Sequence, residues 1–187
     1  MDKDSQKQSM GMSWGKFAAM ILTSTAVMFP LMYQLVYEGD HVLFSINRLL
    51  ASLVMGCVMT VIMLAFMWKM YQGQTTKMLV LAGGMLGAIV LLWVNRSQTL
   101  VGDVGFMKSM IPHHSIAINN ASKATITDPR VRELADKIIK AQVREIQEMK
   151  LLIDDIEKNG SRGKNSLPPV EAKVTADMEP EIQQAVK

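Results

Sequence analysis

The sequence predicts an all-α protein with three transmembrane helices, an extracytoplasmic helical hairpin and a disordered C-terminal tail. Three long apolar runs lie between Phe17 and Val94, and beyond Asn95 the chain becomes charged, with apolar residues at helical spacing. After Gly160 the sequence is rich in Ser, Lys, Pro and Glu and has little periodicity, which is typical of disorder. We therefore divide the chain into a cytoplasmic flank (1–13), a membrane region (14–96), a hairpin domain (103–160) and a mostly disordered tail (161–187).

The three apolar runs have the length of membrane-spanning helices. A helix needs about 20 apolar residues to cross the hydrocarbon core, with a range of about 17–25. The third run is the shortest and contains three glycines, which suit close packing against a neighbouring helix. The runs are Phe17–Tyr37, Leu49–Trp68 and Met78–Val94, and the glycines are Gly83, Gly84 and Gly87.

Basic residues beside the runs predict the orientation. The loop 38–41 has two acids and no base, whereas the N-terminal flank and the second loop carry lysines, and such bases favour the cytoplasmic side. Arg96 and Lys108 argue weakly against this orientation, because they would lie on the extracytoplasmic side. We expect the N-terminus in the cytoplasm and the hairpin on the periplasmic, extracytoplasmic side of the inner (plasma) membrane. The lysines are Lys3, Lys7, Lys16, Lys69 and Lys77.

A secretory signal peptide is the alternative for the first run, which has a basic flank and an apolar centre. The run is longer than a usual signal core, and no small-residue cleavage site precedes the acidic loop. We therefore expect a retained helix that anchors the chain in the lipid bilayer.

Charge and cysteine usage exclude two classes of protein. The net charge of +3 arises before Asp103, because thirteen bases and thirteen acids balance from that residue onward. The basic pI therefore reflects the membrane flanks, and we expect no nucleic-acid partner. Cys57 is the only cysteine, so a disulfide framework within one chain is excluded.

The segment after the membrane region predicts two helices joined by a short turn. Asp103 is placed to cap the first helix, which breaks at 124–127. Asp128 with Pro129 is a strong start signal for the second helix, and Gly160 is placed to end it. The apolar seam predicted for the second helix is Val131, Leu134, Ile138, Met149, Leu152 and Ile156.

Two polar residues, Gln142 and Glu145, share this seam at about 100° per residue. If the turn centres near Thr127, residues whose numbers sum to about 254–256 lie opposite one another. Met107 then faces Met149, Met110 faces Glu145, and His113 or His114 faces Gln142. A buried carboxylate is costly unless it is paired or helps to bind a metal. Two helices also bury little surface, so we expect a homo-oligomer, with a four-helix bundle in the dimer.

The first hairpin helix gathers two of the three histidines and two methionines within eight residues. Imidazole nitrogen and thioether sulfur are ligands that soft copper prefers. His114 shares one face with both methionines, whereas His113 points toward the flank. The competing interpretation is an ordinary core of methionines with locally hydrogen-bonded histidines. The candidate ligands are Met107, Met110, His113, His114 and Met149, with Gln142 and Glu145 in supporting roles.

Outside this cluster the sequence offers weaker candidates. Met55, Met59, Met63 and Met67 step by four along the second run, which favours packing over a thioether path for Cu(I). His41 could join a metal site, although an interfacial histidine with no role is the favoured interpretation. Nucleophilic, phosphate-binding and di-iron patterns are missing from the sequence, so we expect no enzyme.

The hairpin resembles the domain-of-unknown-function family 305 in two stretches. They are Met107-Lys108-Ser109-Met110-Ile111-Pro112-His113-His114-Ser115-Ile116-Ala117-Ile118 and, with gaps, Asp128 to Met149. The resemblance implies a ferritin-like helical bundle, often exported, with some members binding copper in metal tolerance. Two departures stand out: Asn120 replaces a common methionine, and the chain has one hairpin where many relatives have two.

From these patterns we expect a membrane-anchored copper-binding protein that acts in copper buffering, delivery or metal resistance. Cu(I) is favoured, with Cu(II) and Ag(I) as alternatives, and a copper-handling protein is an expected partner. The alternative is a metal-free membrane module that oligomerises or docks a partner through the hairpin.

Overall fold

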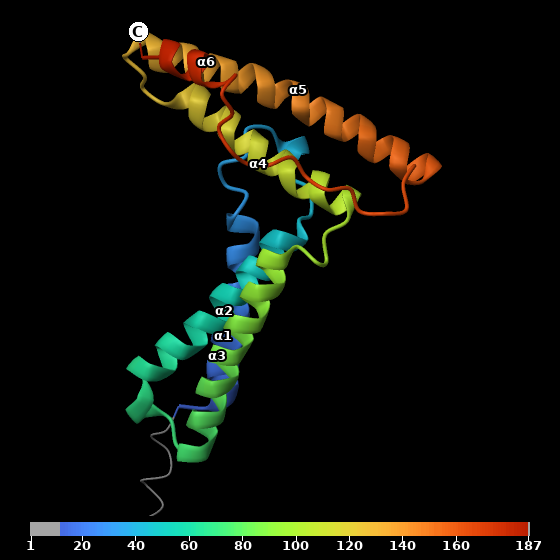
Figure 1. Ribbon diagram of the computed structural model, residues 1–187. Coiled ribbons are helices and arrows are strands. Elements are labelled where there is room, and N and C mark those ends of the chain that lie inside the picture. Colours follow the sequence, from blue (N-terminus) through green and yellow to red (C-terminus); the bar gives the residue numbers. More distant parts are fainter. Residues whose placement is uncertain (1–11, 187) are drawn as a thin grey trace, which may run out of the picture. The chain divides into compact units, whose positions relative to one another are not determined.

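The computed structural model describes residues 12–186, and every regular element in that range is a helix. This confirms the all-α class and the order of apolar helices first, then further helices (Figure 1). The chain forms two compact units. The first unit comprises the residues up to Gln34 together with Phe44–Ser109. The second unit comprises Leu35–Leu43 together with the residues from Met110 onward. Residues 1–11 of the expected cytoplasmic flank lie outside the described residues.

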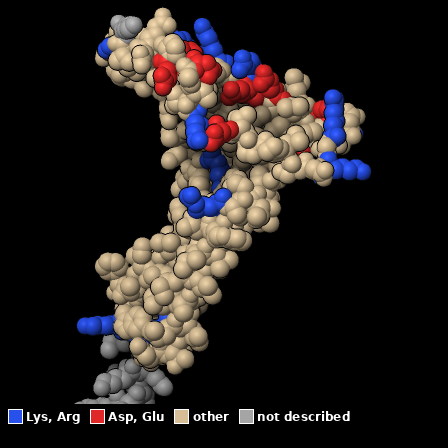
Figure 2. Space-filling view, in the orientation of Figure 1, with Lys and Arg blue, Asp and Glu red and all other residues tan. Residues whose placement is uncertain are grey.

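Three helices of the first unit are long and apolar enough to cross a membrane, as predicted. Figure 2 shows their visible surface as almost uncharged, which fits contact with lipid rather than water. The charged side chains gather instead over the second unit. The three helices are α1 (Trp14–Leu31), α2 (Ile46–Phe66) and α3 (Gln74–Ser97).

Helix α1 ends at Leu31, before the first apolar run itself ends at Tyr37. The Arg48 guanidinium binds the backbone carbonyl of Met32 and places a positive charge at the helix C-terminus, where it is favourable. Arg48 also lies over the Tyr33 ring, 4.3 Å from its centroid. The chain therefore leaves the helix six residues before the apolar run ends.

Small residues set the packing of the three helices, as the glycine pattern predicted. A Cβ atom added at Gly84 would lie 3.0 Å from Val61 Cγ2 and 3.3 Å from the Cys57 carbonyl oxygen. Gly87 lies against the Cys57 thiol in the same way, whereas Gly83 has open space around it. Gly84 and Gly87 therefore lie at a close contact with α2, whereas Gly83 does not.

An aromatic cluster closes one end of this unit. Phe17 and Tyr71 are buried with Leu64, and the Phe17 and Tyr71 ring centroids lie 5.2 Å apart in an edge-to-face arrangement. Met63 and Met67 pack against this cluster. For these two methionines of the α2 stripe, the packing interpretation is therefore supported.

The second unit contains the predicted hairpin from Met110 onward, and the start of its first helix belongs to the first unit. Helix α4 (Asp103–Lys123) ends before the turn, and α5 (Pro129–Asn159) begins after Asp128, whose side chain accepts a hydrogen bond from Arg130 N–H. Gly160 follows α5 with a φ of +82°, a conformation that favours glycine. The start and stop signals of α5 are thus confirmed, whereas Asp103 is the first residue of α4 rather than its cap.

The predicted seam of α5 is wrong in most of its members. Four residues of the predicted seam are exposed. The residues that are buried form a different stripe, rotated around the helix axis, and only Met149 belongs to both the predicted seam and the buried stripe. The apolar residues of α5 cover a wider arc than one neighbouring helix can bury. The exposed members are Val131, Leu134, Ile138 and Leu152; the buried stripe is Ala135, Ile146, Met149 and Ile153.

The segment after Gly160 has little regular structure until a short helix, α6 (Glu179–Gln184). Its residues are exposed throughout the described range. Arg130 of α5 donates a hydrogen bond to the Val186 carbonyl, which ties the end of the chain to the start of the hairpin's second helix.

Candidate functional site

The centre of the hairpin holds a histidine–carboxylate pair. His114 of α4 has only 13% of its side chain exposed, and its Nδ1 lies 3.2 Å from the Glu145 carboxylate of α5. Nδ1 itself is fully buried and makes no aligned hydrogen bond. Gln142 donates from its amide to the same Glu145 oxygen at 3.4 Å. A buried imidazole nitrogen is thus held beside a carboxylate that a second side chain helps to position.

A methionine lies one turn from each member of this pair. Met110 precedes His114 by four residues and Met149 follows Glu145 by four, so each thioether shares a face with its neighbour. Because α4 and α5 run antiparallel (Figure 1), the His114–Glu145 contact implies that Met110 and Met149 share the next level of the hairpin. The two helices therefore place imidazole and carboxylate at one level and the two thioethers one turn further from the connecting turn.

This register corrects the prediction. The contacting residues His114 and Glu145 sum to 259, not 254–256, so Glu145 rather than Gln142 lies beside the histidine. Side chains tilt toward the N-terminus of their own helix. On α4 this tilt leads away from the turn and on α5 toward it, so a residue of α4 meets one of α5 that lies further out.

The other two predicted ligands differ in exposure. His113 is exposed, with its ring centroid 5.9 Å from that of His114. Met107 is 5% exposed and belongs to the part of α4 grouped with the first unit. Within the second unit, His114 and Glu145 are thus in contact, Gln142 lies beside Glu145, and Met110 and Met149 are each one helical turn away.

Burial controls the protonation of the central histidine. Desolvation lowers the pKa of His114 below its ordinary value, the Glu145 carboxylate opposes that shift, and His113 adds to it. The imidazole is therefore neutral at and above neutral pH, which is the state that binds a metal.

A second polar cluster, which the sequence analysis missed, joins the loop 35–43 to α4. The Ser115 side chain is fully buried, and its hydroxyl accepts a hydrogen bond from Tyr37 N–H at 2.8 Å. His41 is 5% exposed, and its Nδ1 lies 3.0 Å from the same hydroxyl. Ser115 follows the histidine pair directly, but no local pattern links it to a loop more than 70 residues earlier.

The same loop places two carboxylates beside His41. The 3-10 turn Gly39–His41 sets Glu38 three residues before the histidine, and side chains at this spacing eclipse in such a turn. His41 Nε2 lies 3.8 Å from an oxygen of Glu38 and 3.8 Å from Oδ1 of Asp40. The Lys150 amine binds Oδ2 of Asp40 at 2.6 Å, which lowers the pKa of that carboxyl. The loop is thereby tied to α5 as well.

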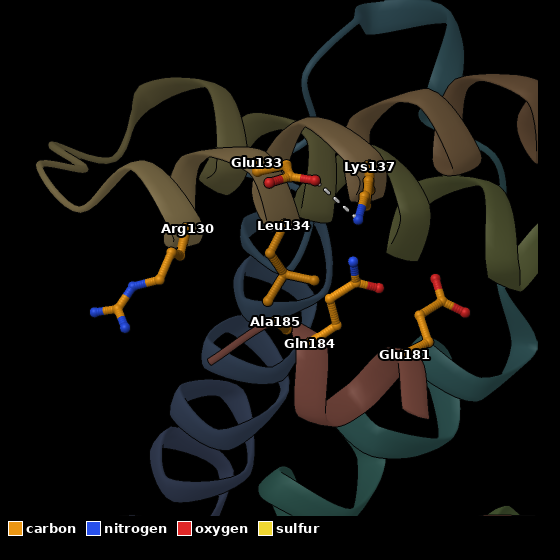
Figure 3. A pocket seen from close by; sticks show the side chains of 7 residues that line it. All are labelled: Arg130, Glu133, Leu134, Lys137, Glu181, Gln184 and Ala185. Atoms are coloured by element: carbon orange, nitrogen blue, oxygen red, sulfur yellow. Dashed lines mark ion pairs between the residues drawn. The ribbon is translucent and has the colours of Figure 1, made fainter. Parts of the chain in front are cut away.

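A groove of about 550 Å³ lies between the first turns of α5 and α6 (Figure 3). It contains neither imidazole nor thioether, and its ion pair Glu133–Lys137 is a surface pair on one helix. Because such pairs contribute little and the ligand chemistry is absent from the lining, we do not place the function here. The lining residues are Arg130, Glu133, Leu134, Lys137, Glu181, Gln184 and Ala185.

Comparison with known proteins agrees with the resemblance drawn from the motif. Residues 103–186 match the model of a family described as "Domain of unknown function (DUF305)". The uncharacterized protein L153 of Acanthamoeba polyphaga mimivirus is 33% identical over 98 residues, which are 51% of this chain. The aligned part covers 62% of that relative, less than two thirds of its length. No solved structure matches the chain significantly.

Proposed function

We propose that this chain, whose residues 103–186 carry a DUF305 domain, is a membrane-anchored, extracytoplasmic copper-binding protein that acts in copper buffering, delivery or tolerance. One observation carries the proposal. The buried His114 imidazole is fixed beside Glu145, with one thioether on each helix a single turn away. Thioether and imidazole together favour Cu(I), with Ag(I) and Cu(II) as alternatives.

Each residue has a distinct role in this proposal. Met110, His114 and Met149 are the core ligands, and His113 can complete the set. Glu145 lies beside His114 Nδ1 and would accept a hydrogen bond from its N–H once a metal binds Nε2, as is common for metal-binding histidines. Gln142 holds the Glu145 carboxylate in place.

The membrane helices support the second part of the proposal. Three spans would hold the chain in the inner (plasma) membrane lipid bilayer, and the lysine pattern favours a cytoplasmic N-terminus and a periplasmic hairpin. A copper-binding hairpin on a membrane-anchored chain would suit exchange of Cu(I) with a copper-handling partner protein. Thioethers bind without losing a proton, so such a site holds Cu(I) in mildly acidic surroundings.

The exposed apolar stripe of α5 supports assembly into a homo-oligomer. Val131, Leu134, Ile138 and Leu152 are at least 37% exposed, although their helix already packs on α4. A second copy would cover this stripe and complete a four-helix bundle.

The test is Cu(I) affinity of the full chain in detergent, measured against a chromogenic Cu(I) chelator. The double variant Met110→Ala/His114→Ala should lose affinity by more than about 100-fold, beyond the usual effect of removing an orienting partner. Met178→Ala removes an exposed thioether of the tail and should leave affinity unchanged. Equal affinity of the double variant and the wild type would refute the site.

The alternative function, a metal-free interaction module, is favoured by the same exposed stripe on α5. Solution mass with and without copper separates the two functions. Assembly that is independent of copper, in protein purified without chelators and free of metal, would favour the module.

A further inference from the structure

We propose that Glu38, Asp40 and His41 form a second metal site, for a borderline divalent cation such as Zn²⁺, in the loop docked on the hairpin. This site is separate from the thioether site and different in chemistry. One imidazole nitrogen and two carboxylate oxygens suit Zn²⁺, whereas Cu(I) prefers sulfur.

The distances fit such a site. Zn²⁺ with ligand bonds of about 2.0–2.2 Å holds tetrahedral ligand atoms about 3.3–3.6 Å apart. The ligand atoms of Glu38, Asp40 and His41 all lie within 4.8 Å of one another, and both contacts of Nε2 are 3.8 Å. The two carboxylates are 57% and 62% exposed, so small rotations can close the remaining gap.

The buried histidine is the observation that points to a cation. Only 6% of the His41 side chain is exposed, yet its Nε2 faces two carboxylates at distances longer than a hydrogen bond. A lone pair directed at two carboxylates is repelled unless a proton or a metal ion lies between them. A bound Zn²⁺ would remove this repulsion and pair with both carboxylates at once.

The surroundings allow His41 to take the tautomer that a metal requires. Ser115 Oγ accepts from Tyr37 N–H and lies 3.0 Å from His41 Nδ1, so an Nδ1–H donated to its second lone pair would leave Nε2 for the metal. Lys150 binds the outer oxygen of Asp40 and leaves Oδ1 toward the site. The Ser115 and Lys150 contacts thus orient two of the three ligands.

There is also room for a fourth ligand. A small cavity of about 70 Å³ is lined by Glu38 and His41 on the loop and by Ile118, Val143 and other hairpin residues. This volume exceeds what one water molecule requires. A water molecule there would complete a four-coordinate site with three protein ligands.

The test is Zn²⁺ affinity of the full chain in detergent, measured by competition with a metallochromic indicator. Glu38→Gln and His41→Asn should each weaken Zn²⁺ binding at least about tenfold. Glu148→Gln, which removes an exposed carboxylate paired only with Arg144 on the same helix, should not. Glu38 is exposed, so its variant tests the site even if His41→Asn fails to fold.

The proposal is overturned if Glu38→Gln binds Zn²⁺ as tightly as the wild type, or if Met110→Ala/His114→Ala abolishes Zn²⁺ binding. Cu(I) affinity measured on the same variants keeps the two sites distinguishable. Glu38→Gln should leave the Cu(I) affinity unchanged. A negative result for the thioether site would therefore not affect the conclusion on Zn²⁺ binding, and a negative Zn²⁺ result would not affect the conclusion on Cu(I) binding.

Discussion

The membrane helices and the hairpin both bury polar side chains, but of different kinds. In the first unit Ser45, Ser52 and Lys77 are buried, and each forms a hydrogen bond with a backbone group. In the first unit the packing depends on aromatic and aliphatic side chains around Phe17 and Leu64 and on glycines that admit a neighbouring backbone. In the second unit His41, Ser115 and the Nδ1 atom of His114 are buried. A buried polar group is costly unless it has a partner. The two units therefore differ in chemistry: the second buries imidazoles, which are able to bind a metal, whereas the first buries serines and a lysine bonded to the backbone.

The largest expected effect tests the packing half of this contrast. Gly84→Leu places a side chain against Val61 and the Cys57 carbonyl, so overpacking should lower the free energy of unfolding by about 3 kcal/mol. Gly83→Leu lies one residue away, where an added Cβ meets nothing within 4 Å, and should stay close to the wild type. Thermal unfolding in detergent measures both. Equal destabilisation of the two variants would mean that close helix approach does not hold this unit together.

A smaller effect is expected at the polar centre of the hairpin. Glu145→Gln keeps the size of the side chain but removes the charge beside His114 Nδ1. Cu(I) affinity should fall about 10–100-fold, which is about 1.4–2.7 kcal/mol. Glu133→Gln changes an exposed carboxylate on the same helix and serves as the control. Unchanged affinity in Glu145→Gln would show that the carboxylate does not orient the histidine.

The docked loop should respond to loss of a single hydroxyl. Ser115→Ala leaves Tyr37 N–H and His41 Nδ1 without their partner, which should cost about 2 kcal/mol. Hydrogen exchange should accelerate in residues 35–43 and hardly at all in the membrane helices. Ser109→Ala removes a hydroxyl that bonds only within its own helix, to Phe106, and should leave the loop protected. If both variants exchange alike, the loop is not held by Ser115.

The sequence predicted the features that depend on local patterns. Apolar run length indicated the three candidate spans, and Asp128, Pro129 and Gly160 fixed the ends of α5 because capping depends on a few adjacent residues. The site was predicted in its residue types, but its register was displaced because side-chain tilt shifts contacts between helices. The role of Ser115 escaped because its partners are distant in the sequence. Docking of a short loop onto a distant helix leaves no periodic pattern in the sequence from which it could be predicted.

The smallest expected effect concerns pH. Burial lowers the pKa of His114, so the unfolded chain binds the proton more tightly than the folded chain. The stability that this provides is present above about pH 6.5 and is lost as the pH falls through the folded pKa. The metal-free wild type should therefore lose more stability than His114→Gln between pH 7.5 and pH 5, as thermal unfolding at each pH (about 0.5 pH unit apart) would show. A wild type that instead gained stability relative to the variant would mean that attraction between the imidazolium and Glu145 outweighs desolvation. The hairpin would then hold a charged pair, and His114 would be a weaker ligand at neutral pH.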